Sequence, residues 1–561
     1  MVPTRHWWAR VAIGVLCAAG IAPAGLAQSP AAARDLAVNV DGIADWMTSA
    51  AYIDATAYFR RWGKADAGWA DDSSLKLSAD NLPLGDADAV SHLRGYPDGL
   101  YKLRWEGGAD VSVAGFARVV PGTVKKTGAV TEADVEVRHA GPDDLVSLRV
   151  RNVDANRPLK RIELISPGYA DASAVFRNEF VRRVRPFPTI RFMDWQQTNG
   201  NPLKEWQDRP RPTGFNRTGA KGVPVEDLVT LANVTRRDVW LNVPHGVSDD
   251  YVTEFAKYLR DNLHPEAIIH VEYSNEVWNF SFQQAKDNLV AARAQPSLTK
   301  TDDFGRGAQR AADRLGKIAV TFKGVFGATA YDKRVRPTVG GFVAVTYWGQ
   351  AQLEFLQANY PGLVKQIAIA PYFGVENDMK PVDVAGATAD QLFDFCDHWI
   401  DTKIADWVKA HAGLAKQFNV ALVAYEGGVH FTALEGKNED LKRKMQNDRR
   451  MARTLQKLFD MWRANGGGLF VQFGHIGPYS KFGYWALLER PDARGSVKWD
   501  YFMSKLLPPG DADLDGRVTA ADMAIVQQNV GQAGKWWEDG DFNADGVVDE
   551  TDVAVAKAGM K

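Results

Sequence analysis

Short runs of apolar residues recur along residues 28–509, and longer segments with the periodicity of amphipathic helices separate them. One such segment, 251–263, places apolar residues on one helical face, and Ser248 stands where it can cap the helix start. Apolar runs that alternate with helices are typical of parallel α/β sheets, and eight of them predict a (β/α)8 barrel, the TIM barrel. The eight predicted strands are 36–40, 189–193, 239–243, 268–273, 341–345, 366–370, 420–424 and 468–472.

One long interval interrupts this alternation, between the first and the second run. Residues 74–166 contain short strands with alternating polar and apolar positions, such as 100–105 and 146–150, with Gly, Pro and Asp at the turns. This pattern predicts a β-sandwich inserted into the barrel. The barrel then consists of a first βα unit at 28–73 and the remaining units at 167–509.

The N-terminus has the pattern of a secretory signal peptide. Arg5 and Arg10 precede an apolar run at 11–22, and the small residues Gly25 and Ala27 suit cleavage after Ala27. We therefore predict a signal peptide at 1–27 and a secreted or cell-surface protein. The alternative is that the run stays in place as an N-terminal membrane anchor. Later stretches fall short of the roughly 18 apolar residues of a membrane helix, so we expect no transmembrane segment after cleavage.

Cys396 is the only cysteine that remains after such cleavage, which excludes an internal disulfide. Stability must therefore come from a large core or from bound metal. Because Cys396 lies in an apolar run at 392–396, we expect a buried, inert thiol rather than a nucleophile.

Charge and aromatic content narrow the range of partners. The 67 basic and 69 acidic residues give a net charge of -2, so no basic surplus exists to hold nucleic acid. The 18 Trp, 16 Tyr and 26 Phe supply many flat apolar faces with polar edges. Clefts that bind sugars use such faces.

The C-terminal segment contains an internal repeat with a period of 30 residues. Each copy has oxygen ligands at loop positions 1, 3, 5, 9 and 12 and a glycine at position 6, the spacing of a calcium loop. Two copies in register favour Ca²⁺ over an acidic surface turn, so we predict two structural Ca²⁺ sites and no cofactor for catalysis. The predicted ligands, with position 7 included, are Asp511, Asp513, Asp515, Arg517, Thr519 and Asp522 in the first loop, and Asp541, Asn543, Asp545, Val547, Asp549 and Asp552 in the second.

These loops lack the entering helix of an ordinary EF-hand. Pro508 and Pro509 precede the first loop and prevent a helix there, whereas helical segments follow the loops at 520–530 and 551–559. Loop followed by helix, twice, resembles the type I dockerin module, which docks onto cohesin receptors in cellulose-degrading assemblies.

The dockerin resemblance covers residues 510–561 and implies a cohesin-like or cell-surface partner. The sequence departs from the dockerin pattern just before position 12 of each loop, where dockerins carry the residues that recognise their partner. Here these positions hold Ala520, Ala521, Glu550 and Thr551.

Two glutamates come directly after predicted barrel strands. Glu276 follows the fourth strand and Glu426 follows the seventh. Barrel enzymes place catalytic groups at the carboxyl ends of strands, so we expect these side chains to face each other across the barrel mouth. Two such carboxylates suit the cleavage of a glycosidic bond, because one protonates the departing oxygen while the other attacks the anomeric carbon. Alternatively they are ordinary solvated glutamates, although each ends an apolar run, where an unpaired charge is costly.

The order of these residues resembles the clan A retaining glycoside hydrolases, a superfamily of (β/α)8 barrels, over most of residues 36–489. In that superfamily an Asn-Glu pair ends strand four and a second Glu ends strand seven. The resemblance implies that Glu276 is the acid/base, that Asn275 reaches the substrate 2-hydroxyl and that Glu426 is the nucleophile. It also implies that Arg191, near the end of strand two, keeps the nucleophile ionised, unless Arg191 pairs with Asp194 instead.

Further residues after strand ends are candidates for binding substrate. His245 follows strand three and Tyr372 follows strand six, where relatives keep polar groups around the site; the alternative for each is a hydrogen-bonded core residue. Four tryptophans either stack on sugar rings or pack the barrel rim: Trp195, Trp278, Trp348 and Trp485.

The sequence therefore predicts an exported glycosidase that hydrolyses O-glycosyl bonds of a polysaccharide or oligosaccharide by double displacement. Two other functions stay open: a non-catalytic carbohydrate-binding or scaffold-attached protein, and a calcium-dependent adhesion protein. Metal-dependent hydrolysis is less favoured, because the histidines show no pair of ligands at helical spacing.

Overall fold

The computed structural model describes residues 35–67, 74–170, 172–374, 386–433 and 438–560. The predicted signal peptide at 1–27 lies outside the described residues. Within the described part of the chain, no helix combines the length and the apolar character needed to cross a membrane.

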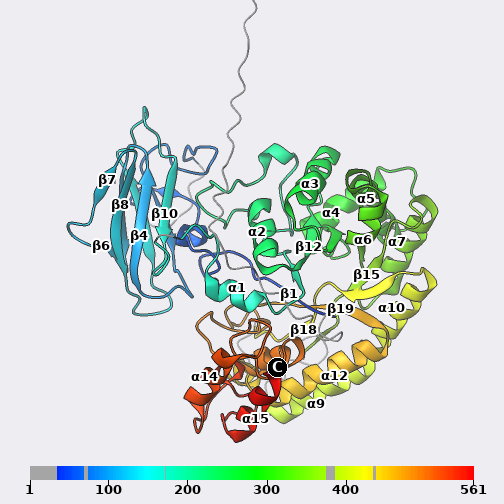
Figure 1. The fold of residues 1–561 in the computed structure, drawn as a ribbon. Coiled ribbons are helices and arrows are strands. Elements are labelled where there is room, and N and C mark those ends of the chain that lie inside the picture. Colours follow the sequence, from blue (N-terminus) through cyan, green and yellow to red (C-terminus); the bar gives the residue numbers. More distant parts are fainter. Residues whose placement is uncertain (1–34, 68–73, 171, 375–385, 434–437, 561) are drawn as a thin grey trace, which may run out of the picture.

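Eight parallel strands close into a barrel in the order β1-β11-β12-β13-β14-β15-β17-β19, and β1 pairs with β19 to complete the ring (Figure 1). This confirms the predicted TIM barrel. The strands are β1 (Leu36–Asn39), β11 (Thr189–Arg191), β12 (Asp238–Val243), β13 (Ile269–Tyr273), β14 (Val335–Gly340), β15 (Gln366–Ile369), β17 (Ala421–Ala424) and β19 (Gly467–Gln472).

Helices follow the strands and cover the outside of the barrel (Figure 1). In α3 (Asp249–Asn262), Ser248 caps the N-terminus by accepting a hydrogen bond from the backbone of Tyr251, as expected. Cys396 is fully buried in α9 (Ala389–Trp399). The other helices around the barrel are α1 (Asn178–Val184), α2 (Val225–Thr235), α4 (Gln283–Arg293), α5 (Asp303–Phe326), α6 (Ala328–Arg334), α7 (Thr346–Asn359), α10 (Ala405–Gln417), α11 (Glu439–Met445), α12 (Arg450–Ala464) and α13 (Val497–Leu506).

The prediction for the fifth strand was wrong. Residues 341–345 form the turn before α7, whereas the strand is β14, directly upstream. Arg336 and Pro337 break the apolar pattern of β14, and proline has no N–H for a central strand. The strand nevertheless forms, because Val335 and Val339 are buried and the carbonyl of Pro337 accepts a hydrogen bond from the backbone of Lys365.

The segment between β1 and α1 forms two antiparallel sheets, which we call the β insert, residues 63–165. One sheet has the order β2-β3-β9-β5 and the other β10-β4-β8-β6, with β7 beside β8. The insert begins at β2, ahead of the predicted boundary at residue 74, and the packing of its sheets as a sandwich stays a prediction. The strands are β2 (Gly63–Lys64), β3 (Ala87–Ser91), β4 (Gly99–Glu106), β5 (Asp110–Gly115), β6 (Ala117–Val119), β7 (Lys125–Thr127), β8 (Val130–Val137), β9 (Val146–Arg151) and β10 (Arg161–Ile165).

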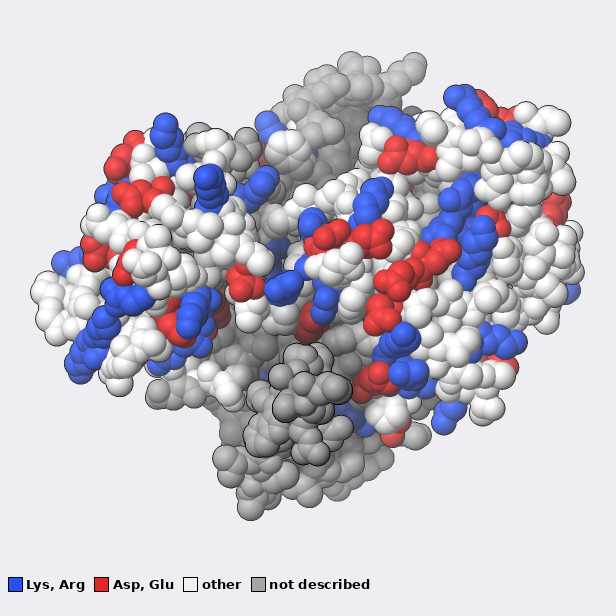
Figure 2. Space-filling view, turned by 90° about the horizontal axis from the view of Figure 1, so that it is seen from above, with Lys and Arg blue, Asp and Glu red and all other residues white. Residues whose placement is uncertain are grey.

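The place of the β insert in the chain determines which end of the barrel it adjoins. It leaves the barrel after β1 and returns at α1, so it grows from the carboxyl ends of the strands, where barrel enzymes have their active sites. It forms a separate lobe beside the barrel in Figure 1. Basic and acidic side chains intermingle over both lobes on the face in Figure 2, as the near-zero net charge predicts.

The C-terminal module, residues 510–560, packs directly on the barrel (Figure 1). Its helices are α14 (Ala520–Asn529) and α15 (Glu550–Gly559), close to the expected bounds. Glu538 of the module is buried and binds two arginines of α1: Arg183 at 2.9 Å and Arg182 at 2.6 Å. Arg494, in the loop before α13, adds an ion pair to Asp539 at 2.9 Å. The module is therefore a fixed part of the molecule.

Candidate active site

Arg191 connects three barrel strands at the carboxyl end of β11. It is fully buried, and its Nη1 donates to Oε2 of Glu426 at 3.0 Å. Its Nη2 donates to Oδ1 of Asn275 at 2.9 Å and lies 3.3 Å from Oε2 of Glu272. Asp194, the alternative partner, accepts a hydrogen bond from Asn39 instead. Arg191 thus makes the expected ion pair with Glu426.

Glu276 stands in a turn directly after β13, and its backbone is left-handed, with φ of 42°. This conformation is costly for a residue with a side chain and is held by its surroundings. The half-buried carboxylate accepts hydrogen bonds from the hydroxyl of Tyr425 at 3.2 Å and from Nδ2 of Asn279 at 2.9 Å. The turn therefore fixes the direction of this carboxylate.

Glu426 follows β17 and is 7% exposed. Two crossed contacts bring it together with Glu276. Tyr425, its neighbour in the chain, binds Glu276, while Asn275, the neighbour of Glu276, shares Arg191 with Glu426. The two carboxylates therefore belong to one polar cluster at the end of the barrel where the sequence analysis places the site.

Burial sets the protonation of this cluster. It raises the pKa of both Glu276 and Glu426, and the charge on Glu276 raises that of Glu426 further. A charge on one carboxylate therefore disfavours ionisation of the other. The guanidinium of Arg191 touches Glu426 directly and opposes part of the rise in its pKa, which burial nevertheless raises to about 8. Arg191 also opposes the rise in the pKa of Glu276, without direct contact.

The sequence analysis missed two members of the cluster. Glu272 is buried within β13 and accepts hydrogen bonds from Trp240 and Asn242, both at 2.9 Å. A charged residue inside the apolar run 268–273 is the signal that could have revealed it. Tyr425 was missed because no local pattern shows that the hydroxyl of a residue just after a strand reaches a carboxylate 149 positions away.

Aromatic residues lie beside the glutamates. Tyr372 belongs to β16 (Tyr372–Phe373), which pairs with β18 (Gly428–Val429) beyond the barrel. Its pKa lies well above the usual value, mainly through burial and then through the charges of Glu426 and Glu276. The ring of Tyr372 packs 5.4 Å from that of His430, whose Nδ1 lies 3.2 Å from Nε1 of Trp485. Tyr372 and Trp485 are both half-buried, so part of each side chain is accessible.

The other tryptophans differ in their environment. Trp195 is 1% exposed and stacks on Phe180 and Tyr52, and Trp348 is equally buried, so of the two alternatives for these tryptophans the structure favours packing over stacking on sugar. Both fill the core because neighbouring elements cover their faces. Trp278 is half-buried and stacks on Phe342 at 4.1 Å, which covers one face of its ring.

His245 is not part of the cluster around the glutamates. Its Nε2 lies 3.0 Å from a carboxylate oxygen of Asp287, and its carbonyl accepts a hydrogen bond from the hydroxyl of Tyr273. Its role in binding substrate stays a prediction.

The first loop of the C-terminal module presents oxygen atoms for a cation. Asp511, Asp513 and Asp522 offer carboxylate oxygens that all lie within 4.8 Å of one another. Burial, and then the neighbouring carboxylates, raise the pKa of Asp511 to about 8. Such a cluster of hard oxygen ligands fits Ca²⁺, whose charge removes the mutual repulsion.

The second loop repeats the geometry of the first. The carboxylates at position 1, Asp511 and Asp541, accept hydrogen bonds from the glycine N–H at position 6, at 2.8 and 2.7 Å. Burial also raises the pKa of Asp541, to about 6. Position 12 is Asp522 or Asp552, whose buried carboxylate accepts backbone hydrogen bonds from its own loop. The same fold of backbone thus surrounds both candidate sites.

Comparisons with solved structures return several enzymes. An endo-1,4-beta-D-mannanase from Thermotoga petrophila RKU-1 is 11% identical, with 58% of this chain and 93% of that chain covered and a TM-score of 0.31. The xylanase10C from Cellvibrio japonicus is 12% identical, with coverages of 79% and 97% and a TM-score of 0.33. An endo-1,4-beta-xylanase from Caldicellulosiruptor owensensis is 10% identical, with coverages of 58% and 92% and a TM-score of 0.35. The strand order itself establishes the barrel.

Sequence comparisons identify one part of the chain. No curated protein shows significant similarity to the chain as a whole. The model of the Dockerin type I domain matches residues 509–560, the segment that contains both acidic loops and their helices. The C-terminal module of this chain is therefore a dockerin type I domain.

Proposed function

We propose that the chain is a glycoside hydrolase that cleaves a polysaccharide with retention of anomeric configuration. The observation that carries the proposal is the cluster around Arg191, which joins Glu426 to Asn275 and, through the crossed contact of Tyr425, to Glu276. Two neighbouring carboxyl groups at the mouth of a (β/α)8 barrel, of which one is protonated and the other ionised, would supply the acid and the nucleophile for glycosidic cleavage.

In the first step the Glu426 carboxylate attacks the anomeric carbon while the glycosidic bond breaks. The departing oxygen takes the proton of Glu276, and a glycosyl ester forms on Glu426. Once Glu426 is an ester its charge is gone, so the pKa of Glu276 falls and Glu276 can deprotonate water. That water attacks the anomeric carbon and releases Glu426.

The neighbours of the two glutamates support these roles. Arg191 favours the ionised nucleophile, and by holding Oδ1 of Asn275 it turns the amide Nδ2 away, toward Asn199 at 3.1 Å and, we infer, toward the substrate 2-hydroxyl. The half-buried rings of Tyr372 and Trp485 offer a surface for a sugar ring.

The decisive experiment combines a polysaccharide panel with three variants. We expect Glu276→Gln and Glu426→Gln each to lower kcat at least about 10³-fold on the best substrate, as the loss of an acid or a nucleophile does. Glu254→Gln is the matched control, since Glu254 is only half-buried, lies on α3 outside the barrel and pairs with Lys257. NMR of the first product should show the anomer of the substrate. Full activity in both catalytic variants would overturn the assignment, and bound but uncleaved glycan would favour a carbohydrate-binding protein.

We further propose that the dockerin domain holds two Ca²⁺ ions and attaches the enzyme to a cohesin-like or cell-surface receptor, and that the protein is exported. The repeated loop geometry supports two sites. Equilibrium dialysis with elemental analysis should give two bound Ca²⁺ per chain, and one fewer after Asp511→Asn. A stoichiometry below two in the unmodified protein would contradict the two-site proposal.

A further inference from the structure

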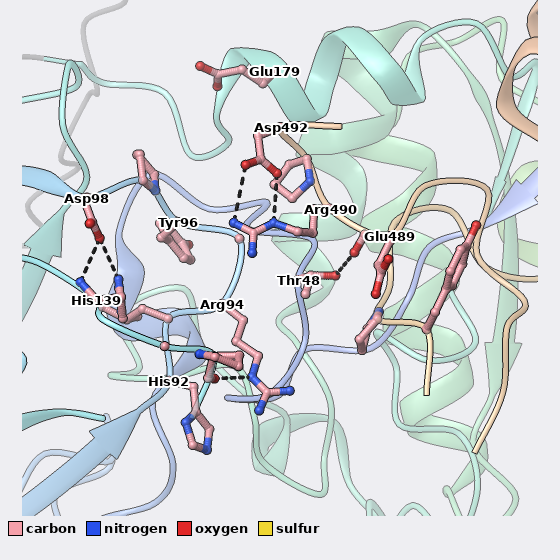
Figure 3. A pocket seen from close by; sticks show the side chains of 18 of the residues that line it. Thr48, His92, Arg94, Tyr96, Asp98, His139, Glu179, Glu489, Arg490 and Asp492 are labelled. Atoms are coloured by element: carbon pink, nitrogen blue, oxygen red, sulfur yellow. Dashed lines mark hydrogen bonds and ion pairs between the residues drawn. The ribbon is translucent and has the colours of Figure 1, made fainter. Parts of the chain in front are cut away.

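A cavity of about 820 Å³ lies between the β insert and the barrel (Figure 3). Segments 92–98 and 139–142 of the insert form one wall. Thr48, after β1, and segments 478–479 and 489–492, after β19, form the other. We call this cavity the insert cleft. Its volume is within the roughly 300–1,000 Å³ of typical ligand sites.

The insert cleft opens at the functional end of the barrel. Its barrel wall consists of loops that follow the carboxyl ends of β1 and β19, the same end at which Glu276 and Glu426 lie. It does not include either glutamate. The cleft is therefore a second site beside the reaction centre.

One residue that lines this cleft carries buried donors without acceptors. Arg177 lines the cavity and is only 7% exposed. Among the described residues, its Nε and Nη1 have no hydrogen-bond partner, and its ion pair with Glu179 is long, at 3.7 Å. Its guanidinium lies over the ring of Tyr96, 5.4 Å from the centroid. Leaving buried guanidinium donors without acceptors is costly, so this position suits an anionic group of a ligand.

The carboxylate is the anion that best matches this environment. Guanidinium and carboxylate form short, charge-assisted hydrogen bonds with defined geometry. A single buried arginine balances one carboxylate, whereas a phosphate with two charges would need a second free cation. The other arginines of the lining already have acidic partners: Arg94 with Asp143 at 2.7 Å, Arg443 with Glu489 at 2.8 Å and Arg490 with Asp492 at 3.0 Å.

The rest of the lining offers donors and acceptors in similar number. Besides Arg177, three arginines and four carboxylates line the cleft, and Asp98 binds His139 at 2.8 Å on the insert side, as Figure 3 shows. A hydroxyl group both donates and accepts, so a polyhydroxyl ligand can use such a surface without a net charge of its own. One carboxylate among many hydroxyls is the chemistry of a uronic acid in a sugar chain.

We propose that the insert cleft binds a saccharide that contains uronic acid, with its carboxylate at Arg177. The proposal rests on the proposed function in one respect, because it takes the ligand to be part of the polysaccharide that Glu276 and Glu426 cleave. The β insert then contributes a binding site for acidic sugars next to the reaction centre.

The test measures binding by isothermal titration calorimetry to the full, calcium-loaded chain with Glu276→Gln, which prevents turnover. The probes are a galacturonic acid trimer, the galactose trimer of the same linkage and a triglutamate peptide. We expect the galacturonate trimer to bind at least about tenfold more tightly than either of the others, since a charge-assisted contact and the hydroxyls both contribute. Equal binding of the peptide, or no preference over galactose, would overturn the proposal.

Two kinds of variant locate the site. Gly141→Trp should block the cleft without strain, because a Cβ at Gly141 meets no atom within 4 Å; Gly85→Trp, also without neighbours but outside the cleft, is the control. We expect Gly141→Trp and Arg177→Ala each to weaken galacturonate binding by about tenfold or more, and Gly85→Trp to leave it unchanged. Unchanged binding in Gly141→Trp would overturn the proposal even if Arg177→Ala does not fold.

These experiments distinguish failure of the cleft proposal from failure of the proposed function. Loss of the proposed function would appear as full hydrolysis by Glu276→Gln and Glu426→Gln, whereas failure of the cleft proposal appears only in the titrations. In the active enzyme, Gly141→Trp should lower kcat/KM on acidic polysaccharide and leave that on a neutral analogue unchanged. An equal decrease of kcat/KM on both substrates would contradict selective recognition of the uronic acid.

Discussion

Arg183 joins the barrel to the dockerin domain, and we expect Arg183→Met to loosen that junction. Arg183 is 3% exposed and Glu538 is 2% exposed, and two nitrogens of Arg183 bind Glu538 at 2.9 and 3.0 Å. Removing one partner of a buried ion pair costs about 3–5 kcal/mol, because the remaining charge stays buried. Arg182 still binds Glu538 in the variant, so we expect about 3 kcal/mol.

Differential scanning calorimetry of the calcium-loaded protein is the appropriate assay. The dockerin domain has only a small core of its own, Val526, Val548, Val553 and Ala556, so a weakened junction should let it unfold before the barrel. We expect a separate transition at lower temperature in Arg183→Met. Arg236→Met is the control, because its partner Glu266 is exposed and such surface pairs contribute about 0–1 kcal/mol.

The double variant Arg183→Met/Glu538→Leu sharpens the test. It removes the stranded charge, so it should recover part of the loss, as apolar replacement of buried ion pairs does. The coupling argument is refuted if Arg183→Met and Arg236→Met unfold at the same temperature, or if the double variant is less stable by the sum of both single changes.

Three further changes test the site and the calcium loops. Tyr425→Phe removes a hydrogen bond that favours the ionised form of Glu276. The pKa of Glu276 should therefore rise, and the alkaline limb of the pH profile of kcat/KM should move up by roughly half to one pH unit. An alkaline limb that stays in place or moves down would contradict this contact. Trp485→Ala should raise KM severalfold with kcat nearly unchanged, and Trp407→Ala, on α10, should change neither; equal effects would argue against a sugar at Trp485. Removal of Ca²⁺ with EDTA should lower the unfolding temperature of the dockerin domain. A site that binds Ca²⁺ at a free concentration of 100 times its Kd loses about 2.7 kcal/mol of stabilisation when the ion is removed. In Asp511→Asn the decrease caused by EDTA should be smaller, because one of the two sites no longer binds Ca²⁺.

Much of the fold was predictable from local patterns. Seven of the eight barrel strands match apolar runs, because a buried parallel strand needs a continuous apolar segment. β14 was missed because Arg336 and Pro337 hide the strand, whose burial depends on β13 and β15 beside it. The dockerin loops were predicted with their helices, since the ligands of each loop lie within twelve consecutive residues.

The candidate site was predicted in part. The pairing of Arg191 with Glu426 agrees with expectation, but the support from Glu272 and Tyr425 was missed. Trp195 and Trp348 stand after strand ends, and only the elements packed around them show that their rings are core. The position of a residue after a strand therefore predicts at which end of the barrel it lies. Whether its side chain is exposed depends on the packing of neighbouring elements and cannot be predicted from that position.

The sequence by itself determined the properties that reside in consecutive residues: strands, helix starts, the two glutamates at strand ends and the calcium-ligand spacing. The tertiary structure alone decided which distant groups meet. It set Glu538 against Arg183, 355 positions away, and left Arg177 without a hydrogen-bonding partner at Nε and Nη1, among the described residues, beside a cleft between insert and barrel. The physical reason is that burial and charge pairing depend on neighbours in space, whereas periodicity and loop geometry depend on neighbours in the chain.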